Sequence, residues 1–295
     1  MTEKHDISED EIRIIGGSKH TPSGRKHWWI WVLLAAAIVA VAVLVIDLQK
    51  DDIQTSTDDT QTTEGGEQTT EVMENATPQW LDNIDNSLPS GIILSDTIID
   101  SLHLRVLTPI NTTPELYIGK LSESDTDILL ATMAADIRRD NGKIVGAYVY
   151  GGEPLSWGLS KRGYCAIFDG RMTIGTADNS PLFEQATEQG GYFFRQYAAV
   201  QGGNAVENNP ENAAPRRALC VIASRYCIVA SDERLTMNDF SKALTKLHAS
   251  EAIYLVGGMA HGWWRDDKGH IKHFIEGNNR PINKKYLNYI VFRKN

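Results

Sequence analysis

Short apolar runs separated by polar turns fill the C-terminal part of the chain, and one stretch near its end gives a clear order of elements. Residues 217–222 and 226–230 are apolar and strand-like with a tight turn between them, so they predict a β-hairpin. Thr236 then precedes apolar residues at helical spacing, with Asp239 three positions after it, which predicts a capped helix with one buried stripe. The run 252–256 is continuously apolar and too short for a buried helix, so it predicts a strand.

The helix lies where a crossover between two neighbouring strands would be, and the last strand ends at Gly257-Gly258. Glycines at the end of a buried strand let backbone amides approach a ligand without a Cβ in the way. Ligands of open α/β sheets bind outside the carboxyl ends of such strands. We therefore expect a site at these glycines; the simpler alternative is that they only make a turn.

Further strands are expected over 92–99 and 102–107, ahead of the stretch just described. Asn-Gly at 141–142 and Asp-Gly at 169–170 each separate two apolar runs, and these dipeptides tolerate the positive φ of a two-residue hairpin turn. The sequence therefore predicts an α+β fold of mixed, largely antiparallel sheets with a few packed helices.

Near the N-terminus, residues 28–46 form an apolar run of 19 residues with no charge, which predicts one transmembrane helix. Basic residues at 25–27 precede the run and Asp47 follows it, so the positive-inside rule places the tail 1–27 in the cytoplasm and the rest in the periplasm or outside the cell. A cleaved signal peptide is the alternative, but its apolar region would be shorter and followed by small residues.

The distribution of charge distinguishes an acidic linker from the folded domain that follows it. Residues 47–79 hold nine Asp or Glu and one Lys, a net charge of −8 out of −9 for the chain, in a Thr- and Gln-rich composition typical of a disordered tether. The domain is expected over 80–295 and is close to neutral, which argues against nucleic-acid binding. Three cysteines without a CxxC pair favour buried thiols over a metal or redox motif: Cys165, Cys220 and Cys227.

A family resemblance rests on the same C-terminal stretch. The order Arg-Ala-aliphatic, second strand, acidic turn, helix and aliphatic-x-Gly-Gly resembles the C-terminal half of the phosphodiester glycosidase family, and the resemblance extends over roughly residues 110–293. The family motif Leu-Asp-Gly-Gly-Gly-Ser corresponds here to Leu-Val-Gly-Gly-Met-Ala at 255–260. Val256 thus replaces the family's aspartate and Ala260 its serine, so fold is better supported than chemistry.

The resemblance implies hydrolysis of a glycosidic bond whose leaving group is a phosphodiester. Such a site needs cations or amides to stabilise the departing phosphate more than it needs a strong acid. Arg217 corresponds to the family's arginine before the strand, and a guanidinium suits bidentate phosphate contact. The amides of Gly257 and Gly258 are expected to add donors. For Arg217 the alternative is an ion pair at a strand edge.

Most glycosidases also use carboxylates as acid and base. Four candidates lie near the expected site: Asp136, Asp232, Glu233 and Asp266. We expect Asp136 to be catalytic, because an acid within an apolar run must be paired or functional. For Asp232 and Glu233 the alternative is an exposed turn position.

Aromatic and basic residues complete the predicted substrate site. Trp263 and Trp264 follow the glycines, and indole faces stack on sugar rings. Adjacent residues of a strand point to opposite faces, so one ring is expected at an exposed rim. Tyr192 and Arg195 lie in a glycine-led segment similar to one that crosses the family's pocket, and they are expected on the opposite wall. Packing in the core is the alternative for all four.

Three functions remain open. The first is a membrane-anchored hydrolase of a sugar-1-phosphodiester or envelope glycan, with a carbohydrate or sugar phosphate as substrate and no metal or cofactor. The second is a non-catalytic relative that binds a glycan or scaffolds the envelope. The third is a protein that recruits a partner through residues 1–27.

Overall fold

The structure, a computed structural model, describes residues 78–258, 260–275 and 287–295. These residues all belong to the compact unit Asn75–Asn295. Within them, no helix has the length and apolar character needed to cross a membrane. The predicted transmembrane helix 28–46, the tail before it and nearly all of the acidic linker lie outside the described residues.

Strands dominate the described part of the chain, and two helices accompany them. The elements in chain order are β1 (Gly91–Ile99), β2 (Leu102–Ile110), β3 (Thr112–Ile118), β4 (Ile128–Met133), β5 (Ala147–Tyr150), β6 (Glu153–Trp157), β7 (Gly163–Phe168), β8 (Arg171–Thr176), α2 (Leu182–Glu188), β9 (Tyr192–Gln196), β10 (Ala198–Gln201), β11 (Asn204–Ala205), β12 (Ala214–Ile222), β13 (Arg225–Leu235), α3 (Met237–Lys246), β14 (Ala249–Tyr254), β15 (Gly262–Arg265), β16 (Ile271–His273) and β17 (Asn288–Lys294).

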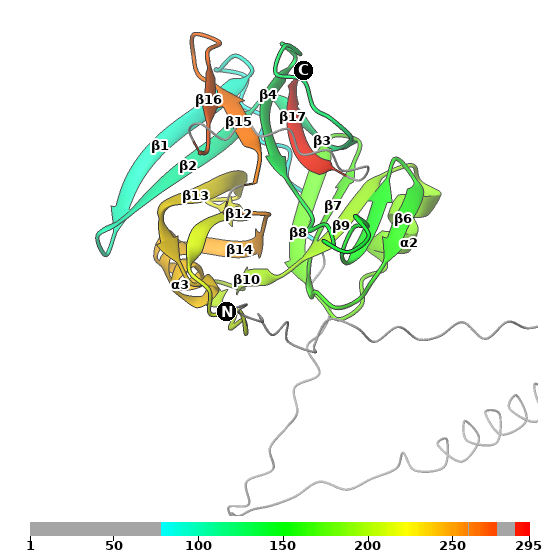
Figure 1. The fold of residues 1–295 in the computed structure, drawn as a ribbon. Coiled ribbons are helices and arrows are strands. Elements are labelled where there is room, and N and C mark those ends of the chain that lie inside the picture. Colours follow the sequence, from blue (N-terminus) through cyan, green and yellow to red (C-terminus); the bar gives the residue numbers. More distant parts are fainter. Residues whose placement is uncertain (1–77, 259, 276–286) are drawn as a thin grey trace, which may run out of the picture. The chain divides into compact units, whose positions relative to one another are not determined.

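The described strands form three sheets, and all of their ladders are antiparallel (Figure 1). A seven-stranded sheet has the order β1-β2-β13-β12-β14-β10-β11. The two five-stranded sheets have the orders β16-β15-β4-β17-β3 and β6-β5-β9-β7-β8. The structure therefore supports the β-rich, antiparallel part of the predicted fold class.

One apolar core is shared by all three sheets. It contains Leu107 and Ile228 from the seven-stranded sheet, Leu130 and Ile290 from the sheet around β4, and Phe194 from the sheet around β9. Each of these side chains is almost completely buried. Because residues of all three sheets pack in this core, distant parts of the sequence are brought together there.

The helix α3 begins as the sequence predicts. The side chain of Thr236 accepts a hydrogen bond from the amide of Asp239, and Phe240 and Leu244 are buried against the outer face of the seven-stranded sheet. Strands β13 and β14 both pair antiparallel with β12, so α3 connects two strands that run in the same direction. The predicted crossover is present, but β12 lies between the two strands that it joins, so they are not neighbours as expected.

Two of the predicted hairpins have two-residue turns with both central residues at positive φ. These are Asp169-Gly170, with φ of 47° and 73°, and Ala223-Ser224, with φ of 48° and 58°. The hairpin predicted around 141–142 is different. Only the bridge between Ile137 and Ile144 forms there, because the loop between them spans more than the two expected residues.

Candidate functional site

Gly257 and Gly258 bring the chain after β14 against β12. A Cβ on Gly257 would lie 2.7 Å from the carbonyl oxygen of Pro215, a distance that no side chain tolerates. Gly258 has φ of +59°, and its amide donates to the same carbonyl at 2.7 Å. The Gly258 amide, which was expected to bind a ligand, is therefore hydrogen-bonded to Pro215. Gly257 and Gly258 together allow the two backbone segments to lie in close contact.

Arg217, on β12 beside these glycines, is a buried cation with a side-chain hydroxyl as acceptor. The residue is 3% exposed, and its Nη1 donates to Oγ1 of Thr132 at 2.7 Å. Its guanidinium carbon lies 4.0 Å from the centroid of the Phe274 ring. Burial, followed by the nearby Arg105 cation, lowers the pKa of Arg217, yet a guanidinium keeps its charge at neutral pH.

No carboxylate within residues 78–258, 260–275 and 287–295 forms an ion pair with Arg217. Its Nε is also buried without a hydrogen-bond partner in this part of the chain. An isolated buried charge is costly, so a guanidinium held in this way favours an anion nearby. The alternative of an ion pair at a strand edge does not describe this arginine.

Asp136 lies in a separate cluster with Lys161 and Gln196. The ammonium of Lys161, whose side chain is 4% exposed, contacts the Asp136 carboxylate and donates to Oε1 of Gln196 at 2.8 Å. Nε2 of Gln196 donates to Asp136 at 3.2 Å. Burial alone would raise the pKa of Asp136, but the Lys161 ammonium outweighs it and lowers that pKa below its ordinary value. Asp136 is thus a paired, ionised carboxylate.

The end of β14 connects the two clusters. The amide of Tyr254 donates to the carbonyl of Tyr197 at 2.9 Å, and the amide of Leu255 donates to the carbonyl of Arg217 at 2.9 Å. Lys161 in turn lies 4.7 Å from the centroid of the Tyr197 ring. The two predicted catalytic residues, Arg217 and Asp136, therefore lie on opposite sides of the end of β14. Each has its own polar partners.

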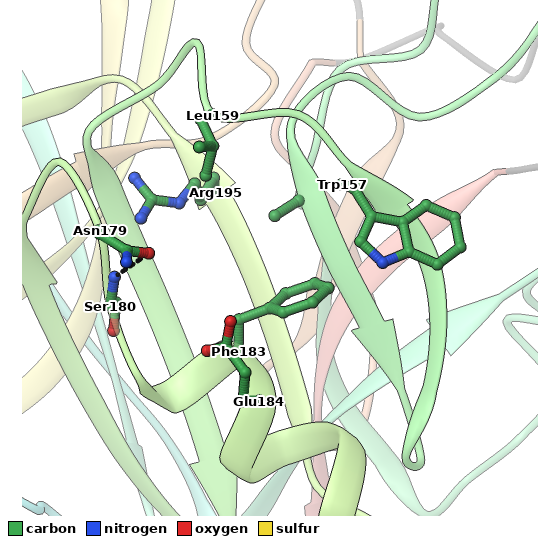
Figure 2. Close-up of a pocket in the computed structure, with 8 residues that line it drawn as sticks. Trp157, Leu159, Asn179, Ser180, Phe183, Glu184 and Arg195 are labelled. Atoms are coloured by element: carbon green, nitrogen blue, oxygen red, sulfur yellow. Dashed lines mark hydrogen bonds between the residues drawn. The ribbon is translucent and has the colours of Figure 1, made fainter. Parts of the chain in front are cut away.

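Arg195 lines a pocket on the face of β9 opposite to Gln196 and its cluster (Figure 2). The pocket has a volume of about 170 Å³, and its lining residues are Ala147, Trp157, Leu159, Asn179, Ser180, Phe183, Glu184 and Arg195. Arg195 is buried and its Nη1 donates to the carbonyls of Lys161 and Ala177, both at 2.8 Å. Trp157 is 65% exposed and lies across the pocket from Arg195 in Figure 2. A cation, a carboxylate, an amide and two aromatic rings thus line one small cavity.

The remaining predicted binding residues do not join this pocket. Tyr192 precedes Arg195 by three positions on β9, so its side chain leaves the opposite face, where its ring lies 5.8 Å from that of Tyr150. Trp263 and Trp264 are both buried, which corrects the expectation of one exposed ring. The reason is that both faces of β15 are covered: Trp264 packs on Phe274, with ring centroids 5.1 Å apart, while Trp263 belongs to a separate apolar cluster.

Sequence reasoning missed Lys161, Gln196 and Trp157. None lies in a motif, and Lys161 precedes Arg162 in a segment that reads as a polar loop. The weak signal for Trp157 is its position at the end of a short strand, beside Gly158, where an aromatic side chain is easily exposed.

The comparisons with known proteins place the fold. No protein-family model and no curated protein matches the chain. Among solved structures, the catalytic domain of zebrafish N-acetylglucosamine-1-phosphodiester alpha-N-acetylglucosaminidase, auto-inhibited by its pro-peptide, is similar with a TM-score of 0.54 and 13% identity. That match covers 74% of this chain and 88% of the other. A hypothetical protein from Synechocystis is similar with a TM-score of 0.50 and 14% identity, over 69% of this chain and 62% of the other.

Identities this low show a shared fold and leave the activity open. At the level of architecture, the chain is similar to the catalytic domain of a phosphodiester glycosidase, as the sequence resemblance implied.

Proposed function

We propose that this domain binds a phosphorylated or phosphodiester-linked glycan in the pocket lined by Arg195 and Trp157. The observation that carries the proposal is the composition of the pocket, whose lining includes a buried guanidinium and an exposed indole. A guanidinium suits a phosphate oxygen, and an indole face suits the apolar face of a sugar ring. The fold supports the same class of ligand, because one similar structure is a domain that acts on a sugar-1-phosphodiester by its name.

Hydrolysis of a sugar-1-phosphodiester is the second candidate. It is favoured by Asp136, an ionised carboxylate whose side chain is 42% exposed and therefore accessible to a substrate or a water. Arg217 would hold the departing phosphodiester from the other side of the β14 end. Val256 replaces the family's aspartate and packs against an apolar cluster, which is why we place binding before hydrolysis.

The proposal includes a location. Residues 28–46 would anchor the chain in a membrane, with the acidic segment 47–79 holding the domain away from the surface, outside the cytoplasm. This rests on the apolar run and on the charges that flank it. No feature of the folded domain supports the third function, recruitment of a partner through residues 1–27.

Binding is tested with the full-length chain in detergent, by calorimetry against methyl sugar-1-phosphates and the matched neutral sugars. We expect the phosphorylated sugars to bind and Trp157→Ala to weaken them roughly three- to tenfold, since an aromatic contact contributes about 0.5–1.5 kcal/mol. Ile98→Ala is the control, because Ile98 is also exposed but lies at the tip of β1. Equal binding by wild type and Trp157→Ala contradicts the proposed pocket.

Turnover is measured on the same compounds, with Asp136→Asn beside the wild type. Sugar release that disappears in the variant while binding persists supports the hydrolase. If the wild type binds these compounds but releases no sugar, the hydrolase proposal is wrong and only the binding function is supported.

A further inference from the structure

We propose that Glu123, His261 and His273 form a binding site for a divalent transition metal, with zinc as the preferred ion. The site goes beyond the proposed glycan binding and does not depend on it. One ligand atom from each of the three residues can be chosen so that all three lie within 4.8 Å of one another. No motif in the sequence indicated this site, and no metal was expected there.

The two histidines reach the site from one hairpin. Trp263 on β15 pairs directly with His273 on β16, so their side chains leave the same face of the sheet. His261 lies two residues before Trp263, and its carbonyl accepts from the amide of Met133, which continues the pairing of β15 with β4. Residues two apart on a strand share a face, and the imidazoles of His261 and His273 therefore lie together, with ring centroids 6.4 Å apart.

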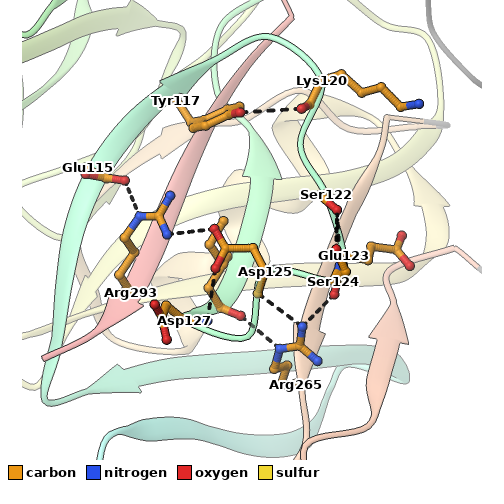
Figure 3. A network of polar contacts seen from close by, with 11 residues as sticks. Glu115, Tyr117, Lys120, Ser122, Glu123, Ser124, Asp125, Asp127, Arg265 and Arg293 are labelled. Carbon is orange, nitrogen blue, oxygen red and sulfur yellow. Dashed lines mark hydrogen bonds and ion pairs between the residues drawn. The ribbon is translucent and has the colours of Figure 1, made fainter.

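Glu123 comes from the loop between β3 and β4, and Arg265 fixes this loop (Figure 3). Nη2 of Arg265 donates to the carbonyls of Glu123 at 2.6 Å and Asp125 at 3.2 Å, and its Nε donates to Ile128 at 3.1 Å. Arg293 holds the side chain of Asp125 in the same loop at 3.0 Å. The Glu123 carboxylate points away from the Arg265 guanidinium in Figure 3 and is left for the histidines.

The distances between the three side chains are compatible with a metal site. Nε2 of His261 lies 3.4 Å from one Glu123 oxygen, and Nε2 of His273 lies 3.7 Å from the other. Charge-assisted hydrogen bonds are shorter, at about 2.7–2.9 Å. Ligand atoms that are each about 2.0–2.1 Å from a tetrahedral zinc lie roughly 3.3–3.4 Å from one another. The 3.4 Å separation of His261 Nε2 from Glu123 matches this spacing, and the wider separations, up to 4.8 Å, require the side chains to close in on an ion.

The donor set identifies the class of ion. Two imidazoles and one carboxylate suit zinc and its first-row neighbours, whereas magnesium and calcium prefer oxygen ligands alone. Three protein ligands leave a fourth position for water or an exogenous oxygen, which is the arrangement of catalytic rather than structural zinc. All three side chains are only partly buried, so an ion has access from solvent.

Zinc binding is measured on the full-length chain after removal of metal with a chelator. We expect calorimetry to show saturable zinc binding, and cobalt(II) to give visible d–d bands of a four- or five-coordinate site. Zinc is also expected to raise the unfolding temperature of the wild type in a concentration-dependent manner that magnesium does not reproduce, since a ligand that binds only the folded state stabilises it.

The variants Glu123→Gln, His261→Ala and His273→Ala are each expected to lose more than tenfold in zinc affinity and to lose the cobalt bands. The matched control is His270→Ala on the turn of the same hairpin, because its imidazole is 69% exposed and contacts Asp266 instead. Circular dichroism checks that each variant is folded, and the wild-type unfolding temperature tests the proposal without any substitution. Absence of zinc binding in the wild type, or binding that all three variants retain, overturns the site.

Discussion

The guanidinium of Arg217 donates a 2.7 Å hydrogen bond to the hydroxyl of Thr132 and so joins β12 of one sheet to β4 of another. Both side chains are buried. Among the described residues the Thr132 hydroxyl is the only side-chain acceptor of this cation; the guanidinium also lies over the Phe274 ring, and its Nε has no hydrogen-bond partner. The fold therefore keeps a charge in its interior at a cost to stability, which is typical of functional sites.

Thr132→Val removes the acceptor and keeps the shape. We expect the free energy of unfolding to fall by about 1.5–3 kcal/mol, because a charged donor is left unsatisfied in the interior. Denaturant unfolding of the full-length chain measures the change. Thr113→Val on β3 is the control, since Thr113 is exposed on the same sheet and its loss is expected to change little. A similar effect at both positions contradicts the role of the Arg217 contact.

The pair of Asp136 and Lys161 predicts a pH dependence. The pKa of Asp136 is lowered in the folded state. Asp136 therefore contributes stability that is present above the ordinary carboxyl pKa of about 3.9, and this stability is lost as the pH falls through the lower folded-state pKa. Asp136→Asn is therefore expected to destabilise the protein by about 1–3 kcal/mol at pH 6, with the partial exposure of Asp136 reducing the full cost of an unpaired buried lysine. The difference from wild type is expected to shrink below about pH 4.

The measurement is denaturant unfolding of wild type and variant between pH 3 and 7. Asp140→Asn is the control, because Asp140 forms an exposed pair with Arg138 and such pairs contribute little. A difference at Asp136 that does not depend on pH would show that the carboxylate acts through packing rather than charge.

Gly257 is required by the space around it. Gly257→Ala places a Cβ 2.7 Å from the Pro215 carbonyl oxygen, so β12 and the end of β14 must separate. We expect a loss of about 1–3 kcal/mol in the free energy of unfolding. Gly91→Ala, where the nearest atom would be 3.9 Å away, is expected to be neutral within about 0.5 kcal/mol. Equal tolerance at the two glycines would mean that this backbone contact is looser than the structure has it.

The sequence predicted what local chemistry determines. The hairpin turns at Asp169-Gly170 and Ala223-Ser224 and the cap of α3 at Thr236 each depend on neighbouring residues, and the structure contains them. The pairing of Arg217 with Thr132 joins residues 85 positions apart, and that of Glu123 with His261 joins residues 138 apart. No periodicity carries information over such separations.

The exposure of individual side chains also could not be predicted from a local sequence pattern. Trp263 and Trp264 alternate on β15 as a strand requires, but whether a face is covered depends on the sheets and loops packed over it. The same limit applies to Trp157, which lies at the end of the edge strand β6 and is exposed.

The three cysteines give the last prediction. All are free and buried, as their spacing suggested, and Cys220 and Cys227 are direct partners across the β12–β13 ladder. Burial raises the pKa of the Cys165 thiol and, with Cys227 beside it, that of Cys220. Because the thiolate is the reactive form, the native thiols are expected to resist iodoacetamide.

Labelling is expected to occur only as the domain unfolds, so its rate should rise with denaturant in parallel with the unfolded fraction, as intact mass spectrometry would show. Ser95→Cys places a thiol on the exposed part of β1 and serves as the control that reacts without denaturant. Rapid labelling of the wild type in native buffer would contradict the closed core, because Cys165 lies in the cluster shared by all three sheets and becomes accessible only when those sheets separate.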